Sequence, residues 1–399
     1  MQFTADRHFF GRNASILLDV LRFAAALVVV LSHMPLFLNG PEFIPERSGN
    51  TAVCIFFVLS GFVIRYVTVT RVPTGRDYAI DRITRIYSVV VPALVLTMLL
   101  EYTAFHHSPT AFRFGADPTP WEYVPKQLLQ NLTFTVGWWG YGFPPLANGA
   151  FWSLSFECVY YALYGFWRYA PRGRWVLIPL LLLLVGPAIT LLFPIWLLGA
   201  ALYDLYAYLH RQKTGIAWAT LAMLLYGAML FVLRDHIVHW LLMTDVHQRS
   251  IALTRLMASF AWGRDQFHGA PLHWLDRLSL SFFISGVLMA VAMLPFLLAL
   301  DRFVPAASKR AERRVRFVAD STFTLYLVHL PVLLWLMTMH GQRWTNWRQG
   351  SAMLGLMIVI SIVLAGAFDH LKNAMRGGLH RLLPAGTDPR RPATPADAG

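Results

Sequence analysis

The chain has 399 residues, of which 56% are hydrophobic and only 14% are charged, and its mean hydropathy is +0.49. This composition excludes an ordinary soluble domain and predicts an all-α integral membrane protein that crosses the bilayer several times. A net charge of +13 would also suit a nucleic-acid-binding protein, but the positions of the basic residues give it another meaning.

Apolar runs of spanning length predict about ten transmembrane helices. The fifth and sixth are separated only by Phe193 and Pro194. If the N-terminus is cytoplasmic, most lysines and arginines fall in inner segments, which follows the positive-inside rule and places both termini in the cytoplasm. The charge is therefore mainly a topology signal, and we expect no nucleic-acid partner. The ten runs lie near residues 15–38, 51–70, 86–105, 150–167, 175–193, 194–209, 216–233, 278–300, 318–340 and 351–368.

The first predicted helix contains an arginine and a histidine inside its apolar run. Charged residues in a hydrocarbon-spanning segment are costly and commonly mark a functional site. At 100° and 1.5 Å per residue, Arg22 and His33 lie about 20° apart around the helix and about 16 Å apart along it. An imidazole serves as a base, an acid or an acyl acceptor, and a guanidinium suits a phosphate. A structural ion pair between Arg22 and Asp19, one turn earlier, is the alternative for the arginine.

Two further arginines precede the third predicted span. Arg82 and Arg85 are three residues apart, which places them on one face of a helix. They either mark the cytoplasmic side of the span or form a second phosphate clamp on the same side as Arg22.

The fourth predicted span carries a carboxylate, Glu157, about 10 Å below its outer end and near the estimated depth of His33. A carboxylate at this position is able to orient the histidine or share its proton, although a structural pair with another polar side chain remains open. His329 is another intramembrane histidine, which we expect to be structural. Cys54 and Cys158 lie in apolar segments and are expected to be packing residues.

The loop before the fourth span is rich in aromatic residues. They form either the aromatic belt of the outer interface or a platform on which sugar rings stack, with an asparagine to recognise hydroxyls. The residues concerned are Trp138, Trp139, Tyr141, Asn148 and Trp152. The histidines between residues 236 and 273 show no compact zinc-binding spacing, so no metal site is expected.

Five segments, in this order, resemble the motifs of the membrane-bound acyltransferase 3 family over about residues 15–370. The resemblance implies an enzyme that acylates, and mostly acetylates, surface polysaccharides and related acceptors. The segments are LDVLRFAAALVVVLSH with Arg22 and His33, FFVLSGFVI with Ser60, DRITRIY with Arg82 and Arg85, FWSLSFECVYYAL with Glu157, and DSTFTLYLVHLPV with His329.

The resemblance supports His33 as catalytic, Arg22 as a donor-site or structural partner, and Arg82 and Arg85 as donor-binding residues. We therefore expect Arg22, Arg82 and Arg85 to bind cytoplasmic acetyl-CoA, and His33 to be catalytic together with Glu157, which is selected by its estimated depth. The aromatic loop would bind a glycan or lipid-linked sugar at the outer side of a bacterial inner membrane. Supporting roles are expected for Asp19, Ser60 and His329.

The expected domain covers residues 1–370, and a basic, disordered tail is expected over 371–399. No fused SGNH domain is expected. The alternative function is a transporter or flippase that uses the same buried charges as a translocation path.

Overall fold

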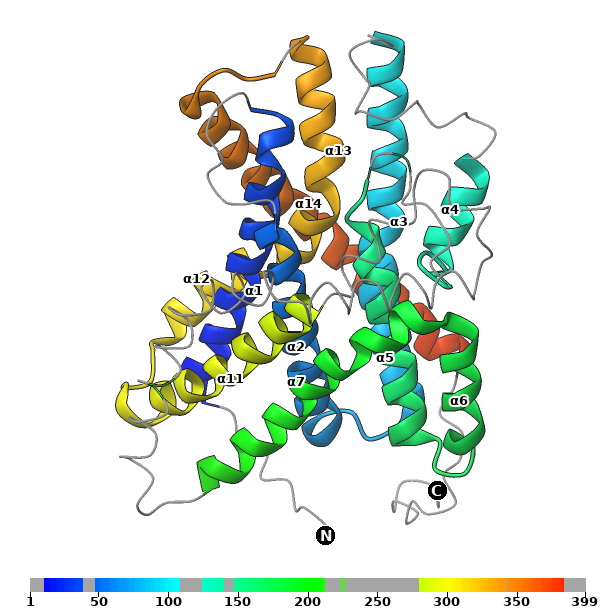
Figure 1. The fold of residues 1–399 in the computed structure, drawn as a ribbon, viewed down its shortest axis with the longest axis vertical. Helices are drawn as coiled ribbons and strands as arrows, with labels where there is room; N and C mark the ends of the chain where they lie inside the picture. The colour runs from blue at the N-terminus through cyan, green and yellow to red at the C-terminus, as the bar shows by residue number, and fades with distance from the viewer. Residues whose placement is uncertain are drawn as a thin grey trace, which may run out of the picture.

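The computed structural model describes residues 11–38, 47–107, 124–139, 146, 148–211, 224, 226, 280–341 and 343–383. The described residues contain no β-strand, and a single-residue bridge joins Leu38 to Trp344. The helices of Figure 1 are α1 (Arg12–His33), a 3-10 turn (Met34–Leu36), α2 (Arg47–Thr70), α3 (Gly75–His107), α4 (Val124–Leu132), α5 (Phe151–Tyr169), α6 (Arg174–Val185), α7 (Pro187–Arg211), α11 (Leu280–Phe303), α12 (Lys309–Ala319), α13 (Thr322–His340) and α14 (Trp347–Leu382).

Seven helical segments in the described part of the chain are long and apolar enough to cross a membrane, and α6 is a shorter apolar helix. The prediction of a helical integral membrane protein is therefore confirmed. The count of ten and the cytoplasmic termini stay predictions, and the predicted span at 216–233 lies outside the described residues. The seven segments are Arg12–Leu36, Ser48–Thr70, Gly75–His107, Pro187–Arg211, Gly286–Phe303, Lys309–His340 and Arg348–Leu382.

The third helix begins earlier than its apolar run. Thr74 caps the first turn of α3, because its Oγ1 accepts a hydrogen bond from the Asp77 amide at 3.1 Å and donates one to the Asp77 carboxylate at 2.7 Å. The helix then continues through Arg82 and Arg85. The two arginines are thus part of α3, which corrects the prediction that they precede the third helix.

The break between the fifth and sixth predicted spans does not fall at Pro194, where the sequence predicted it. Pro194 is inside α7, and the chain turns instead at Gly186, whose φ is +82°. A Cβ at this position would lie 2.9 Å from the ring of Trp139. Glycine therefore supplies both the left-handed backbone and the space for the tryptophan.

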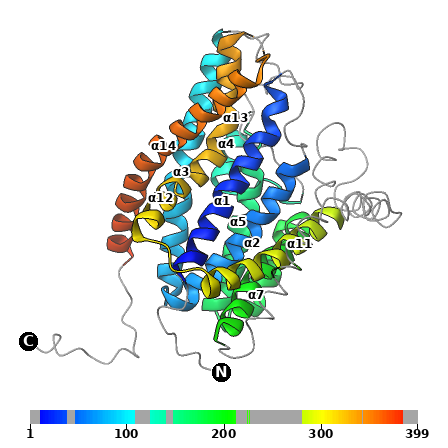
Figure 2. The ribbon, with the colours of Figure 1, turned by 90° about the vertical axis from the view of Figure 1, so that its left-hand side faces the viewer.

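Helix α1 lies near the centre of the helix bundle. In Figure 2, α1 runs diagonally across the bundle, and it packs against α2, α11, α12 and α13. The α3 helix packs against α13 and α14, and α14 follows one edge of the bundle. The backbones of α2 and α7 approach closely, because a Cβ on Gly61 or on Gly199 would lie 2.0 Å from a carbonyl oxygen of the opposing helix. Small residues commonly permit such contacts between membrane helices.

The last helix extends beyond the apolar segment. α14 continues to Leu382, so residues 371–382 of the predicted disordered tail are helical. An ion pair of 2.9 Å joins Arg376 to Asp81, and Arg76 donates to the carbonyl of His380 at 3.2 Å. These contacts fasten the end of α14 to the first turns of α3, and residues 384–399 lie outside the described part.

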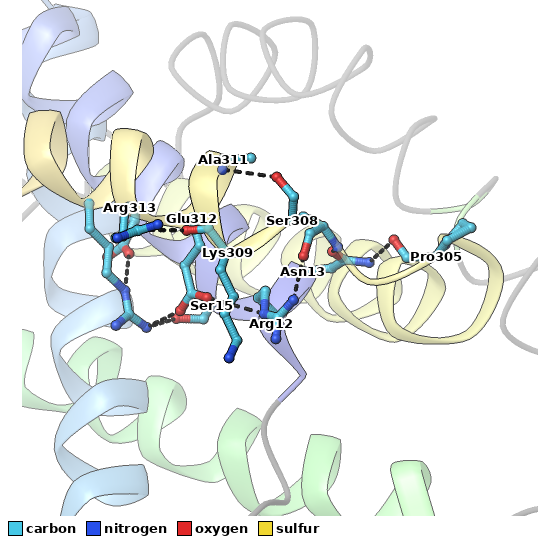
Figure 3. A network of polar contacts seen from close by, with 12 residues as sticks. Arg12, Asn13, Ser15, Pro305, Ser308, Lys309, Ala311, Glu312 and Arg313 are labelled. Atoms are coloured by element: carbon cyan, nitrogen blue, oxygen red, sulfur yellow. Dashed lines mark hydrogen bonds and ion pairs between the residues drawn. The ribbon is translucent and has the colours of Figure 1, made fainter.

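The first turn of α1 is anchored to the segment around α12 (Figure 3). The Asn13 amide donates to the carbonyls of Val304 and Pro305, and its oxygen accepts from the amide of Ala307. Arg12 forms an ion pair with Glu312 at 3.1 Å. Because α12 leads directly into α13, this network fixes where α13 starts relative to α1.

Candidate functional site

A cavity of about 120 Å³ lies among helices α1, α2, α3, α5 and α13. In Figure 1, α1 and α2 lie on one side of the bundle centre and α3 and α5 on the other. Much of the wall is apolar, from residues such as Phe56 and Val63. Its polar side chains are Arg22, Ser60, Arg82, Arg85, Ser153, Glu157, Tyr161, Thr322 and Tyr326.

The three predicted donor-binding arginines meet in this cavity. Arg22 comes from α1, and Arg82 and Arg85 come from neighbouring turns of α3. The buried Nε of Arg82 has no hydrogen-bond partner. Arg85 is exposed although it lies within the bundle, because its side chain faces the cavity. Glu157 is the acidic side chain among the described lining residues, so the three arginines give the wall an excess of positive charge. Such a wall suits an anion with several negative charges.

Asp19 pairs with Arg316 and not with Arg22, the pairing that was the alternative for that arginine. Its carboxylate lies 3.7 Å from Nε of Arg316, which also bonds Glu312. No ion pair within 4.0 Å joins Asp19 to Arg22, although the positive charge of Arg22 acts on the Asp19 carboxylate, and Arg22 lines the cavity. Asp19 nonetheless has a supporting position, because its pairing with Arg316 holds α1 against α12.

Glu157 belongs to the arginine side of the site. It accepts a hydrogen bond of 2.5 Å from Tyr161, whose hydroxyl accepts one of 3.1 Å from Ser60. Ser60 in turn accepts a hydrogen bond from the indole of Trp196 at 3.1 Å. This chain joins α7, α2 and α5. These bonds orient Glu157 toward the cavity, and His33 does not line that cavity. None of the bonds is the predicted contact between the Glu157 carboxylate and His33.

The ring that approaches His33 is that of His329. The two imidazole centroids are 5.3 Å apart, and the ring planes are inclined by 50°. His33 lies at the end of α1, where its Nδ1 is 2.8 Å from the carbonyl oxygen of Val29. A carbonyl oxygen only accepts, so Nδ1 carries the proton and the neutral ring has its lone pair on Nε2. That nitrogen is the basic and nucleophilic atom of His33.

Tyr326 connects the cavity to the histidine pair. It lines the cavity, its hydroxyl is 2.7 Å from Oγ of Ser153, and its ring is 6.2 Å from the ring of His329. Sequence reasoning did not select Tyr326, Ser153 or Tyr161. Their helical spacing was the available signal, because Ser153 and Tyr161 each lie one turn from Glu157, and Tyr326 lies one turn before His329.

Two of the predicted acceptor-binding residues lie in the protein interior. Asn148 has no exposed surface and donates to the carbonyl of Leu327 at 2.8 Å and to Thr97 at 3.1 Å, which ties the loop to α13 and α3. Trp152 is 5% exposed and packs edge-to-face on Phe57. In this arrangement neither presents a surface to a sugar.

The remaining residues of the predicted platform differ in position. Trp139 is partly exposed and donates from its indole to the carbonyl of Leu183 at 3.2 Å, and the partly exposed Trp138 has a buried indole nitrogen without a partner. Tyr141 lies outside the described residues.

No group of three potential metal ligands occurs in the described part of the chain, and the histidines between 236 and 273 lie outside it.

The apolar helices, with three arginines lining one cavity and two histidine rings 5.3 Å apart, define a helical integral membrane protein. Comparison with known families is more specific: the sequence profile described as an acyltransferase domain matches residues 16–366. The chain therefore belongs to the acyltransferase 3 family.

One curated relative is named O-acetyl transferase, from Shigella phage Sf6. It is 27% identical over 156 residues, which cover 37% of this chain and 44% of the relative. The matched part is thus less than half of that protein. No solved structure matches the chain significantly.

Proposed function

We propose that the protein transfers an acetyl group from acetyl-CoA to a hydroxyl of a glycan or lipid-linked sugar. The observation that carries the proposal is the cavity, because three guanidinium groups face it while Glu157 is the carboxylate among its described lining residues. The diphosphate and the ribose phosphate of coenzyme A provide anionic charge that matches this wall. The resemblance to an O-acetyl transferase supports an acetyl group rather than a longer chain.

The spacing along α1 supports different roles for Arg22 and His33. Arg22 lies about 16 Å along the helix from His33. An extended pantetheine arm has a comparable length, so phosphates held by the arginines would leave the thioester near the histidine pair. The side chains of Tyr326 and Ser153 lie on this route and would have to admit the arm.

His33 would perform the transfer through Nε2. In one route, Nε2 takes the proton of the acceptor hydroxyl while the oxygen attacks the thioester carbonyl and the carbon–sulfur bond breaks. In the other, Nε2 first attacks the carbonyl and carries the acetyl group to the acceptor. Both routes need the Nδ1–H tautomer that the Val29 carbonyl favours.

The proposed setting is a bacterial inner membrane, with the donor entering from the cytoplasm and the acceptor from the outer side. The positive-inside pattern supports this orientation. A transporter or flippase would instead move its substrate without consuming a donor.

The test uses purified protein in nanodiscs with acetyl-CoA labelled in the acetyl group. Thiol release and transfer of label to protein or water are followed for wild type, His33→Ala and Arg22→Ala, with the exposed His340→Ala as the matched control. We expect turnover that disappears in His33→Ala, persists in His340→Ala and requires more donor in Arg22→Ala. Folded protein that neither binds nor consumes acetyl-CoA would refute the proposed donor and favour transport.

A further inference from the structure

His329 has an environment that a purely structural histidine would not need. It has no exposed surface, and it lies on α13 one turn beyond the cavity-lining Tyr326. Its Nδ1 is 2.8 Å from the carbonyl oxygen of Tyr326, but its Nε2 is buried without any hydrogen-bond partner. Burying a polar atom unpaired costs free energy, so such an atom in the interior calls for an explanation.

The tautomers of the two histidines follow from their backbone contacts. The carbonyls of Val29 and Tyr326 each require a proton on the neighbouring Nδ1. Each neutral ring therefore has its lone pair on Nε2. Two basic nitrogens on rings 5.3 Å apart form a pair that is well suited to hold one additional proton.

We propose that His329 acts as the second member of a one-proton pair with His33 during acyl transfer. The acceptor's O–H bond breaks as its oxygen bonds to the acetyl carbon, and the proton goes to Nε2 of His33. The imidazolium passes this proton to Nε2 of His329, which returns it to the thiolate released when the carbon–sulfur bond breaks. This inference rests on the proposed function, since it needs a hydroxyl acceptor and a thioester donor.

The position of His329 suits this direction of transfer. His33 does not line the arginine cavity, whereas Tyr326 does. His329 contacts both, with ring separations of 5.3 Å to His33 and 6.2 Å to Tyr326. The proton would thus travel from the acceptor side of the site toward the donor side. Because His329 would give the proton to the departing thiolate, it acts directly on a reacting group and is a catalytic residue in this proposal.

Two substitutions separate the proposed role from packing. In His329→Asn the amide nitrogen keeps the bond to the Tyr326 carbonyl, but nothing replaces Nε2. In His329→Gln the longer side chain places an amide oxygen near Nε2, which accepts a hydrogen bond but cannot carry the proton. The exposed His340→Gln on the same helix is the matched control.

The kinetic test measures acetyl-CoA turnover and binding by these variants in nanodiscs. Since acid–base groups contribute roughly 100-fold or more to rate, we expect kcat to fall about 100-fold in His329→Asn and about tenfold in His329→Gln. KM for acetyl-CoA should stay within about twofold, and His340→Gln should match wild type. Equal kcat in all variants, or a loss confined to KM, would overturn the proposal.

A second readout needs no donor. Imidazole ¹⁵N shifts of labelled wild-type protein at neutral pH, assigned by comparison with His33→Gln and His329→Gln, should show both rings as Nδ1–H tautomers. A proton on either Nε2 would contradict the pair even in a protein that is active. Conversely, wild type that shows both tautomers but no acetyl-CoA binding would refute the proposed donor and leave the pairing intact.

Discussion

The Tyr161 hydroxyl donates a hydrogen bond to the carboxylate of Glu157 at 2.5 Å, four residues earlier on α5. The ring of Tyr161 also lies 5.6 Å from the guanidinium carbon of Arg82. One tyrosine therefore contacts both the acidic and the basic side of the cavity, and it fixes the carboxylate among the groups that would bind the donor.

Replacement of Glu157 by glutamine should strengthen donor binding. The amide still accepts from Tyr161 but no longer repels phosphates, so we expect the Kd for acetyl-CoA to fall about threefold, a change of ~0.7 kcal/mol. Tyr161→Phe, which alters no charge, is the control. If Glu157 instead orients His33, as the sequence predicted, turnover would fall with little change in Kd.

Removing the paired arginines of α3 should weaken donor binding. Arg82→Gln and Arg85→Gln each delete a cavity-facing guanidinium, and a hydrogen bond to a charged group contributes about 1.5–3 kcal/mol. We expect Kd for acetyl-CoA to rise roughly tenfold or more, as measured by titration at constant ionic strength. The exposed Arg172→Gln should bind like wild type. Equal weakening in all three variants would indicate a non-specific charge effect.

The crossing of α2 and α7 should not tolerate a methyl group. A Cβ at Gly61 or Gly199 would meet backbone 2.0 Å away, and overpacking typically destabilises by about 1–3 kcal/mol. Gly61→Ala and Gly199→Ala should lower the melting temperature of detergent-solubilised protein. Gly355→Ala and Gly366→Ala provide matched controls, because nothing lies within 4 Å of their added Cβ. Equal melting temperatures in both sets would contradict the close crossing.

Asn13 should be a stability residue near the start of α1. Asn13→Ala removes donors to the carbonyls of Val304 and Pro305 and an acceptor for the amide of Ala307. Unsatisfied buried groups cost about 1–3 kcal/mol, so the variant should unfold at lower temperature. Asn373→Ala, at an exposed position of α14, should not. Donor binding by the remaining folded protein should be nearly unchanged, since Asn13 does not line the cavity; a selective loss of binding would argue against a purely structural role.

The sequence by itself determined the class of fold and most of the candidate residues. Apolar length predicts spanning helices because the bilayer leaves few ways to satisfy a backbone, and the cost of burying a charge draws attention to Arg22 and His33. Helical periodicity placed these two on one face, and the spacing of Arg82 and Arg85 did the same on α3. These inferences depend on local geometry, which one segment specifies.

Only the tertiary structure decided which side chains meet. Glu157 was matched to His33 by estimated depth, but its bond is with Tyr161, while the ring beside His33 is that of His329, nearly three hundred residues away in sequence. Asn148 and Trp152 looked suited to a sugar, yet both are buried. Depth along a helix follows from residue number, whereas rotation and tilt against neighbouring helices depend on packing across the whole bundle, and no single segment contains that information.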